Sequence, residues 1–306
     1  MVRTRLKRSA EWLLVGAGAA RAARRMRRAQ TIVLAYHNVV PDGEPAWGDR
    51  SLHLPQRDFA RQLELLCRTH DVVPITELLE PDTRGTRPRA VITFDDAYLG
   101  AVTAGLDELA RRGLPATFFV APAFVGGRSF WWDAVAGRSP TGLPGEVRRH
   151  ALEALQGRDD AVREWALRNG HETSDVPAHQ TVAGMDDLTR TAAVPGITLA
   201  SHTWSHVNLA RVTGTELITE LECPLVWLRA RFPNVVPWLS YPYGLSSEAA
   251  ALEAERAGYL GALRIDGGWL GRWAGGAQRY SLPRRNIPAG LTLRGFELRT
   301  SGLAPV

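Results

Sequence analysis

The chain reads Ala90-Val91-Ile92-Thr93-Phe94-Asp95-Asp96 at the point that decides its fold. The first five residues of this stretch are apolar or β-branched, which predicts a buried strand, and two carboxylates follow where the strand ends. A strand that is apolar on both faces is typical of a parallel sheet covered by helices. In such sheets the loops at the carboxyl ends of the strands build the active site, so Asp95 and Asp96 lie where chemistry is expected.

The same alternation of strands and helices continues on both sides of this stretch. Residues 31–36 form an apolar run that ends at His37. Further strands are expected over 71–75, 116–120, 197–200, 235–240 and 260–265, and helices over 55–69, 102–112, 214–231 and 246–257. This pattern predicts an α/β fold of βαβ units around a parallel sheet. Residues 126–190 break the pattern, with helical stretches around 145–168, and we expect an insertion there that shapes the substrate groove.

Basic residues are concentrated at the N-terminus. Residues 1–30 carry nine Lys or Arg side chains and one acid, a local charge of +8, whereas the whole chain is +5, so residues 31–306 sum to −3. A nucleic-acid-binding domain needs a basic surface on its folded body, so we expect no nucleic acid partner. The chain has no run of eighteen apolar residues, and no membrane-spanning helix is predicted.

Two interpretations of residues 1–30 fit equally well. The segment is either a basic, partly apolar helix on an anionic membrane surface or a simple N-terminal helix packed on the domain. A cleaved secretory signal ranks third, because Glu11 and the arginines after residue 20 do not suit one. We therefore expect a cytoplasmic protein, membrane-associated in the first case, rather than a secreted one.

A second motif supplies metal-ligating side chains. Ser201-His202-Thr203-Trp204-Ser205-His206 places two imidazoles four residues apart, a spacing at which one helical turn aims both at one ion. Alone, such a pair is more often a chance surface pair, and adjacent acids often cap a helix. Together with Asp95-Asp96 it describes a site of two histidines and one carboxylate with open positions. One Asp can then bind the metal while the other faces the bound water, as metal-assisted hydrolysis requires.

These motifs resemble those of a known family, the polysaccharide deacetylases (carbohydrate esterase family 4). Thr93-Phe94-Asp95-Asp96 and Ser201–His206 are similar to its first two motifs, and Leu239-Ser240-Tyr241-Pro242-Tyr243-Gly244 resembles its third. Tyr36-His37-Asn38-Val39 resembles the N-terminal segment of the branch that includes biofilm poly-N-acetylglucosamine deacetylases, in which the motif order is permuted. The resemblance runs from about residue 31 to 290 and implies a distorted (β/α)7 barrel, so we expect a catalytic domain over residues 31–306 with the insertion at about 126–190.

The resemblance also implies a role for each matching residue. Asp95 would be the general base and His37 the general acid, while Asp96, His202 and His206 would hold one divalent metal ion, Zn²⁺ by default and otherwise Co²⁺ or Ni²⁺. The third motif, Tyr241, Pro242, Tyr243 and Gly244, would provide the oxyanion hole through the Tyr243 amide and line the groove with its tyrosine rings. The implied activity is metal-dependent removal of acetyl groups from N-acetylated sugars such as N-acetylglucosamine.

Two departures from the family pattern bear on activity. The third motif often begins with an Arg that holds the base Asp, and this chain has Ser240 there, so Arg284 in Leu282-Pro283-Arg284 is our candidate partner for Asp95. No His follows a C-terminal apolar strand, where the unpermuted family keeps its acid, which leaves His37 for that role. We also expect Trp131, Trp132 and Trp204 to be candidates for stacking on sugar rings. The other histidines, His53, His70, His150, His171 and His179, have no partner spacing and are expected to be solvated.

Several functions share this site chemistry. The expected function is N-deacetylation of a polysaccharide, as in exopolysaccharide biosynthesis, or of a lipid-linked glycan. The same site would also cleave an acetyl ester or deacetylate a small amino sugar, because specificity lies in the loops. A catalytically silent carbohydrate-binding barrel is the alternative from another class, and Ser240 is its one support.

Overall fold

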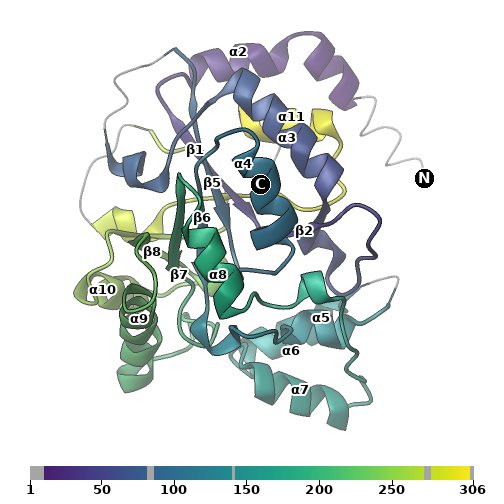
Figure 1. Cartoon of the computed structure of the whole chain (residues 1–306), viewed down its shortest axis with the longest axis vertical. Coiled ribbons are helices and arrows are strands. Elements are labelled where there is room, and N and C mark those ends of the chain that lie inside the picture. The colour runs from purple at the N-terminus through teal and green to yellow at the C-terminus, as the bar shows by residue number, and fades with distance from the viewer. Residues whose placement is uncertain (1–9, 81–85, 140–141, 272–276, 304–306) are drawn as a thin grey trace.

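One parallel sheet organises the chain (Figure 1). The computed structural model describes residues 10–80, 86–139, 142–271 and 277–303. The sheet order is β10-β1-β5-β6-β7-β8-β9, with β4 paired to β5, and β2 and β3 form a second, two-stranded sheet. The bounds are β1 (Thr31–Tyr36), β2 (Asn38–Val40), β3 (His53–Pro55), β4 (Asp71–Val72), β5 (Arg89–Phe94), β6 (Ala116–Val120), β7 (Ile197–Ser201), β8 (Val235–Ser240), β9 (Gly261–Leu263) and β10 (Arg285–Asn286).

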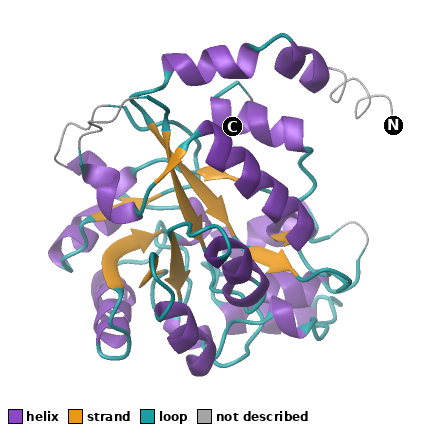
Figure 2. Cartoon of the chain, turned by 45° about the horizontal axis from the view of Figure 1, so that its top comes forward, coloured by secondary structure: helices purple, strands orange, loops and turns teal. Residues whose placement is uncertain are grey.

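The sheet curls into a half-barrel (Figure 2), and the C-terminal segment contacts both of its ends. Leu282 forms a parallel bridge with Leu263 of β9, and the Arg284 amide donates to the Arg264 carbonyl at 3.1 Å. Directly afterwards, Asn286 pairs with Ala35 of β1. Residues 282–286 therefore connect β9 to β1, and the expected distorted (β/α) barrel is confirmed.

Helices cover the outside of this sheet. They are α2 (Ala19–Met26), α3 (Gln56–Thr69), α4 (Leu106–Ala110), α8 (Met185–Ala192), α9 (Gly214–Arg229), α10 (Glu248–Arg256) and α11 (Leu293–Ser301). Two expected elements differ. The strand expected over 71–75 ends at Val72, because Pro74 has no amide to donate, and a 3-10 turn follows from Ile75. The helix expected over 102–112 begins as a π-helix, Ala101–Gly105.

Three helices lie between β6 and α8, at the carboxyl end of the strands (Figure 1). They are α5 (Trp131–Ala136), α6 (Gly145–Glu153) and α7 (Asp159–Arg168). The last two account for the helical stretches expected around 145–168. Because each strand ends on this side, these helices form a wall beside the residues that follow β1, β5 and β7.

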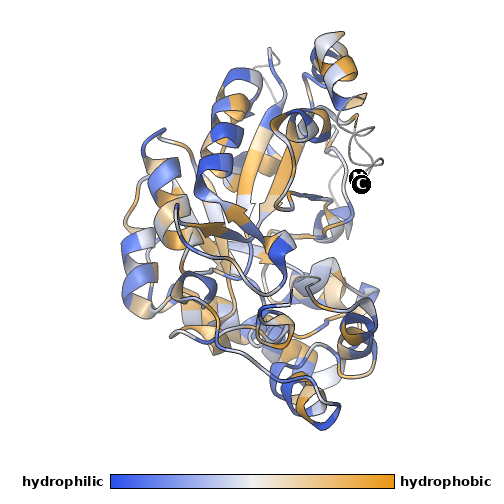
Figure 3. Ribbon diagram, turned by 90° about the vertical axis from the view of Figure 1, so that its right-hand side faces the viewer, coloured by the Kyte–Doolittle hydropathy of each residue, from blue (hydrophilic) through white to orange (hydrophobic). Residues whose placement is uncertain are grey.

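The core places apolar strands directly beneath the chemistry-bearing residues. Every residue of β1 and β5 is buried, and Figure 3 shows the strands as apolar ribbons between helices with hydrophilic outer faces. Phe94, the last residue of β5, stacks on Phe118 at 4.8 Å between ring centroids and on Tyr36 at 5.4 Å. Deleting such a ring costs about 3–5 kcal/mol, so Asp95 follows one of the most firmly held positions of the fold.

The N-terminal segment packs on α11. Residues 10–16 are helical and α2 follows. The buried carboxylate of Glu11 accepts a hydrogen bond from the Thr292 hydroxyl at 2.6 Å, and Arg24 pairs with Glu297 at 3.0 Å. No helix in the described ranges has the length and apolar character needed to cross a membrane.

Three histidines expected to be solvated are buried instead. His53 pairs with Asp133 at 2.9 Å, His70 faces the Thr300 carbonyl at 3.1 Å, and His179 faces the Pro45 carbonyl at 2.9 Å. Each histidine contacts a residue that is distant in the sequence, and spacing along the chain cannot predict such contacts. His53 and Asp133 belong to a buried network, since Asp133 also accepts from the Tyr98 hydroxyl at 2.7 Å.

Candidate active site

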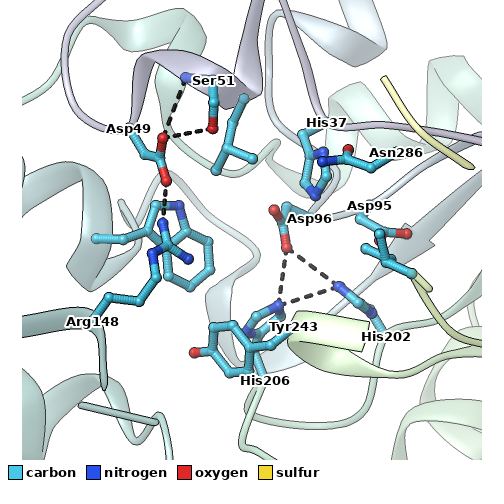
Figure 4. A pocket seen from close by; sticks show the side chains of 13 residues that line it. His37, Asp49, Ser51, Asp95, Asp96, Arg148, His202, His206, Tyr243 and Asn286 are labelled. Atoms are coloured by element: carbon cyan, nitrogen blue, oxygen red, sulfur yellow. Dashed lines mark hydrogen bonds and ion pairs between the residues drawn. The ribbon is translucent and has the colours of Figure 1, made fainter. Parts of the chain in front are cut away.

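A cavity of about 310 Å³ opens at the carboxyl ends of the strands (Figure 4). The loops after β1, β5, β7 and β8 contribute to it, as expected for a parallel sheet. From these loops it receives His37, Asp95, Asp96, His202, His206 and Tyr243. The structure therefore brings together residues that lie more than two hundred positions apart in the sequence.

Three buried ligand atoms converge in this cavity. The Asp96 carboxylate lies 3.4 Å from His202 Nε2 and 3.1 Å from His206 Nε2, and the two Nε2 atoms are 3.2 Å apart. His202 donates its Nδ1 proton to the Ser240 carbonyl at 2.8 Å, so its Nε2 carries a lone pair that faces its two neighbours. Three such electron-rich atoms repel one another unless a proton or a cation lies between them.

This donor set fits a divalent cation. Zinc bonds of about 2.0–2.1 Å place the ligands of a tetrahedral site about 3.3–3.4 Å apart, close to the separations found here. The Ser240 carbonyl fixes the tautomer of His202, as the outer partners of metal-bound histidines usually do. Burial opposes ionisation of Asp96, but His202 and His206 more than offset it and hold the pKa of this carboxyl far below its usual range.

Tight turns, rather than a helix, aim these ligands. The expected helical turn over 202–206 is absent from the described chain, and the expected extended path through Asp95-Asp96 bends sharply. Five non-glycine residues of the site adopt left-handed backbone angles: Asp96 (φ 70°), Ala97 (47°), Thr203 (64°), His206 (57°) and Tyr243 (60°). Each conformation costs about 1–2 kcal/mol. Backbone strain of this kind is typical of functional sites.

Asp95 lies beside the triad and is held by Arg284. Its two carboxylate oxygens accept from the Arg284 guanidinium at 2.8 and 2.7 Å, and both side chains are essentially inaccessible to solvent. The guanidinium also donates to Ser240 Oγ at 2.7 Å and to Thr93 Oγ1 at 3.1 Å. Arg284, the partner expected from the sequence, is therefore in contact with Asp95. Ser240, which stands where the family often has an arginine, accepts a hydrogen bond from Arg284.

This pairing sets the charge of Asp95. Burial opposes ionisation of the carboxyl, but the Arg284 charge outweighs it, with help from His202 and His37, and the pKa of Asp95 lies below its usual range. Asp95 is therefore an ionised acceptor inside the cavity, which is the state a general base needs.

His37 lines the cavity at the end of β1. Burial lowers the pKa of its imidazole, and the negative charges of Asp96 and Asp95 oppose that effect. Figure 4 shows His37 beside Asn286, which also lines the cavity and whose Oδ1 is buried without a hydrogen-bond partner among the described residues. No motif pointed to Asn286; β10 pairing with β1 brings it there.

The third motif divides between the cavity and the core. The Tyr243 ring lies 4.7 Å from the His206 ring and lines the cavity. Pro242 and Gly244 complete its 3-10 turn, and a Cβ on Gly244 would meet the Ile265 backbone nitrogen at 2.8 Å. Tyr241 does not line the groove as expected, because its ring is buried in a separate apolar cluster and its hydroxyl donates to the Tyr280 carbonyl at 2.9 Å.

Of the three tryptophans expected to stack on sugars, Trp132 alone lines this cavity. Its ring lies 5.0 Å from the His206 ring, and its Nε1 donates to the Tyr98 hydroxyl at 2.9 Å. Trp131 is buried and donates to the Tyr243 hydroxyl at 3.0 Å, so it supports the wall from behind. Trp204 lies in a different hollow, against Val226 and Trp227 of α9. Neither Trp131 nor Trp204 therefore lines the cavity, and sugar stacking by either ring stays a prediction.

No sequence pattern indicated the residues of the opposite cavity wall. Arg148 of α6 pairs with Asp49, and both line the cavity. Asp49 in turn accepts from the Ser51 hydroxyl at 2.7 Å and caps the 3-10 turn that leads into β3. These residues come from α6 and from the turn before β3, and no spacing in the sequence relates them to the metal-ligating motifs.

Comparisons with known proteins agree with this geometry. A sequence model described as "Polysaccharide deacetylase" matches residues 82–262. Among solved structures, IcaB from Ammonifex degensii superposes with a TM-score of 0.60 at 14% identity over 90% of this chain and 98% of its own. The Streptococcus pyogenes deacetylase PplD, solved with acetate, gives 0.58 at 15% identity over 90% and 99%.

A third similar structure is BC0361, a polysaccharide deacetylase from Bacillus cereus, with a TM-score of 0.62 at 14% identity over 88% of this chain and 68% of its own. At these identities the three structures show a shared fold. No curated protein matches this chain in sequence. Because the family model spans more than half of the residues and includes Asp95, Asp96, His202 and His206, the chain belongs to the polysaccharide deacetylase family.

Proposed function

We propose that this protein is a metal-dependent N-deacetylase that removes acetyl groups from N-acetylated sugars of a polysaccharide. One observation carries the proposal: an ionised, arginine-held Asp95 opens into the same cavity as the buried triad Asp96, His202 and His206. That combination supplies a base next to a metal site, which is what hydrolysis of an unactivated amide needs.

A divalent ion held by the triad would activate water and polarise the acetyl carbonyl, and the donor set of two imidazoles and one carboxylate makes Zn²⁺ the first choice. Asp95 takes one proton from the attacking water, because Arg284 keeps it ionised. The Tyr243 amide is the proposed donor to the developing oxyanion. His37 gives one proton to the leaving nitrogen. The products are acetate and a free amino sugar, so protons and atoms balance.

The cavity walls support a sugar substrate. Trp132 and Tyr243 present aromatic surface on one side of the triad, and Asp49, Ser51 and Arg148 present hydrogen-bonding groups on another. Aromatic faces stack on the CH faces of sugar rings, and charged groups bind their hydroxyls. The same walls would admit an acetyl ester or a small amino sugar. The alternative of a catalytically silent carbohydrate-binding barrel rested on the missing arginine at Ser240. Arg284 pairs with Asp95 instead, which removes that support.

The test is acetate release from N-acetylglucosamine oligomers, from the monosaccharide and from a small acetyl ester. Metal-loaded wild type is compared with Asp95→Asn, and metal content is measured in both. We expect release from the oligomers that needs metal and falls at least about 10²-fold in the variant while its metal content is unchanged. Release from the ester alone would make the protein an esterase, and sugar binding without any release would make it a binding protein.

A further inference from the structure

A group of arginines surrounds a hollow at the other end of the barrel. The hollow has a volume of about 630 Å³ and is lined by α2, the end of α3 and the segment before β5. We call it the basic hollow, and its arginines are Arg21, Arg24, Arg25, Arg28, Arg68 and Arg87. Six like charges around one depression require a reason, because they repel one another when no anion is present.

Only part of this charge is neutralised within the protein. Arg24 pairs with Glu297 at 3.0 Å, and Arg87 donates to Asp71 through Nε at 2.9 Å. For the remaining four, Arg21, Arg25, Arg28 and Arg68, the described part of the chain provides no ion pair, and all four are exposed. The basic hollow therefore keeps an excess of positive charge that faces solvent.

The arginines of α2 lie on a single face. Ala20 and Ala23 are buried against the domain, while Arg21 and Arg25, four residues apart, point outward. Arg28 continues that face just beyond the end of the helix. The alternation of buried alanine and exposed arginine gives a helix that is anchored on one side and cationic on the other.

Large apolar side chains are exposed on the same N-terminal segment. Trp12 is 57% exposed, Leu13 62% and Met26 84%. Water-exposed tryptophan and leucine next to arginine are typical of a helix that lies in a membrane interface, where the rings enter the acyl boundary and the cations meet the headgroups. A nucleic acid would use the arginines but would leave these apolar side chains without a partner.

The basic hollow and the active-site cavity lie at opposite ends of the same strand. Pro88, which lines the hollow, precedes β5, and Asp95, which lines the cavity, follows it. A strand of this length spans about 20 Å. In Figure 1, α2 lies at the top and α5 to α7, beside the cavity, lie at the bottom.

We propose that the basic hollow and the exposed face of α2 dock on an anionic lipid bilayer, with the active-site cavity facing away from it. In this orientation the substrate reaches the cavity from the aqueous side, which favours a long glycan strand over a sugar attached directly to a lipid headgroup. No residue of the basic hollow lines the active-site cavity, so docking on a bilayer does not depend on the proposed activity.

The test is sedimentation of the full chain with vesicles of phosphatidylcholine alone or mixed with phosphatidylglycerol, at low and high salt. The variant carries Arg21→Gln, Arg25→Gln and Arg28→Gln. The control carries Arg168→Gln, Arg190→Gln and Arg256→Gln, which removes the same charge from exposed positions of α7, α8 and α10. A further variant, Trp12→Ser, tests the apolar contribution, and thermal unfolding verifies that every variant is folded.

We expect binding to the anionic vesicles only, weakened by salt because the attraction is screened. A loss of about fivefold for each of the three arginines predicts a roughly hundredfold weaker affinity for the α2 variant and little change for the control. Trp12→Ser should weaken the binding that remains at high salt. Equal binding to neutral vesicles, equal loss in the control, or no binding at all would overturn the proposal. Self-association or nucleic-acid binding that the α2 variant abolishes, without vesicle binding, would assign the surface to that partner instead.

Discussion

Replacing Arg284 with methionine tests the proposed arrangement of the base most directly. Both carboxylate oxygens of Asp95 accept from this guanidinium, and neither side chain reaches solvent. Arg284→Met therefore leaves a buried carboxylate without its cation. Removing one partner of such a pair costs about 3–5 kcal/mol of folding stability.

The same change reverses the direction of the pKa shift. In the native protein the Arg284 charge overcomes burial and holds the pKa of Asp95 low. Without it, burial dominates and raises the pKa above the ordinary carboxyl value. A base must be deprotonated to act, so the acidic limb of kcat/KM should move upward by at least about two pH units. In the native protein, by contrast, Asp95 should stay ionised to a pH below the ordinary carboxyl range.

The assay is the pH dependence of acetate release, together with urea unfolding. Two companion variants separate charge from shape. Arg284→Lys keeps the charge but loses the two-pronged contact, and should lie between wild type and Arg284→Met. Ser240→Ala removes one acceptor of the guanidinium at 2.7 Å and should cost about 1–3 kcal/mol of stability while leaving the acidic limb in place. An Arg284→Met protein with the wild-type acidic limb and stability within about 1 kcal/mol would refute the reasoning.

Three further predictions concern the metal, pH and backbone. Chelation should lower the free energy of unfolding by about 3 kcal/mol if the ion had been present at a hundred times its Kd, and His206→Ala should abolish that difference in calorimetry. Burial lowers the pKa of His70 to about 3. The contribution of the neutral imidazole to stability is therefore complete above the unfolded pKa of about 6.5 and is lost as pH falls toward 3. Between pH 7 and pH 5 the free energy of unfolding of the wild type should fall by about 2 kcal/mol more than that of His70→Gln. Gly244→Ala forces a Cβ to 2.8 Å from the Ile265 nitrogen at a φ of 71°, and should lower kcat while metal content measured by mass spectrometry stays constant.

The sequence predicted those site residues that follow strands. Asp95, His37 and His202 each come directly after a buried apolar run, and parallel strands bring their carboxyl ends together. Their proximity could therefore be inferred without coordinates. The role of Arg284 could also be predicted, because the chain has Ser240 where an arginine is expected and a buried carboxylate then needs another cation.

The remaining features depend on tertiary contacts. The sequence does not predict which of Tyr241 and Tyr243 faces the cavity, because the left-handed backbone at Tyr243 determines the direction of the two rings. The burial of His53 follows from Asp133, eighty positions away, and the exclusion of Trp131 from the cavity follows from its bond to Tyr243. Spacing along the chain carries information about neighbours on one element, but not about partners that meet only after folding.

Because residues 282–286 close the barrel, the metal site and the base should form in sequence during synthesis. Ribosomal synthesis proceeds from the N-terminus, so Asp96, His202 and His206 all emerge well before Arg284. A nascent chain that ends after β9 already contains every proposed metal ligand, while its Asp95 still has no guanidinium beside it. We expect such a chain to capture its ion first and to gain an ionised base only when the last strand docks between β9 and β1. A chain that lacks the C-terminal segment would then bind the metal but would not deacetylate its substrate.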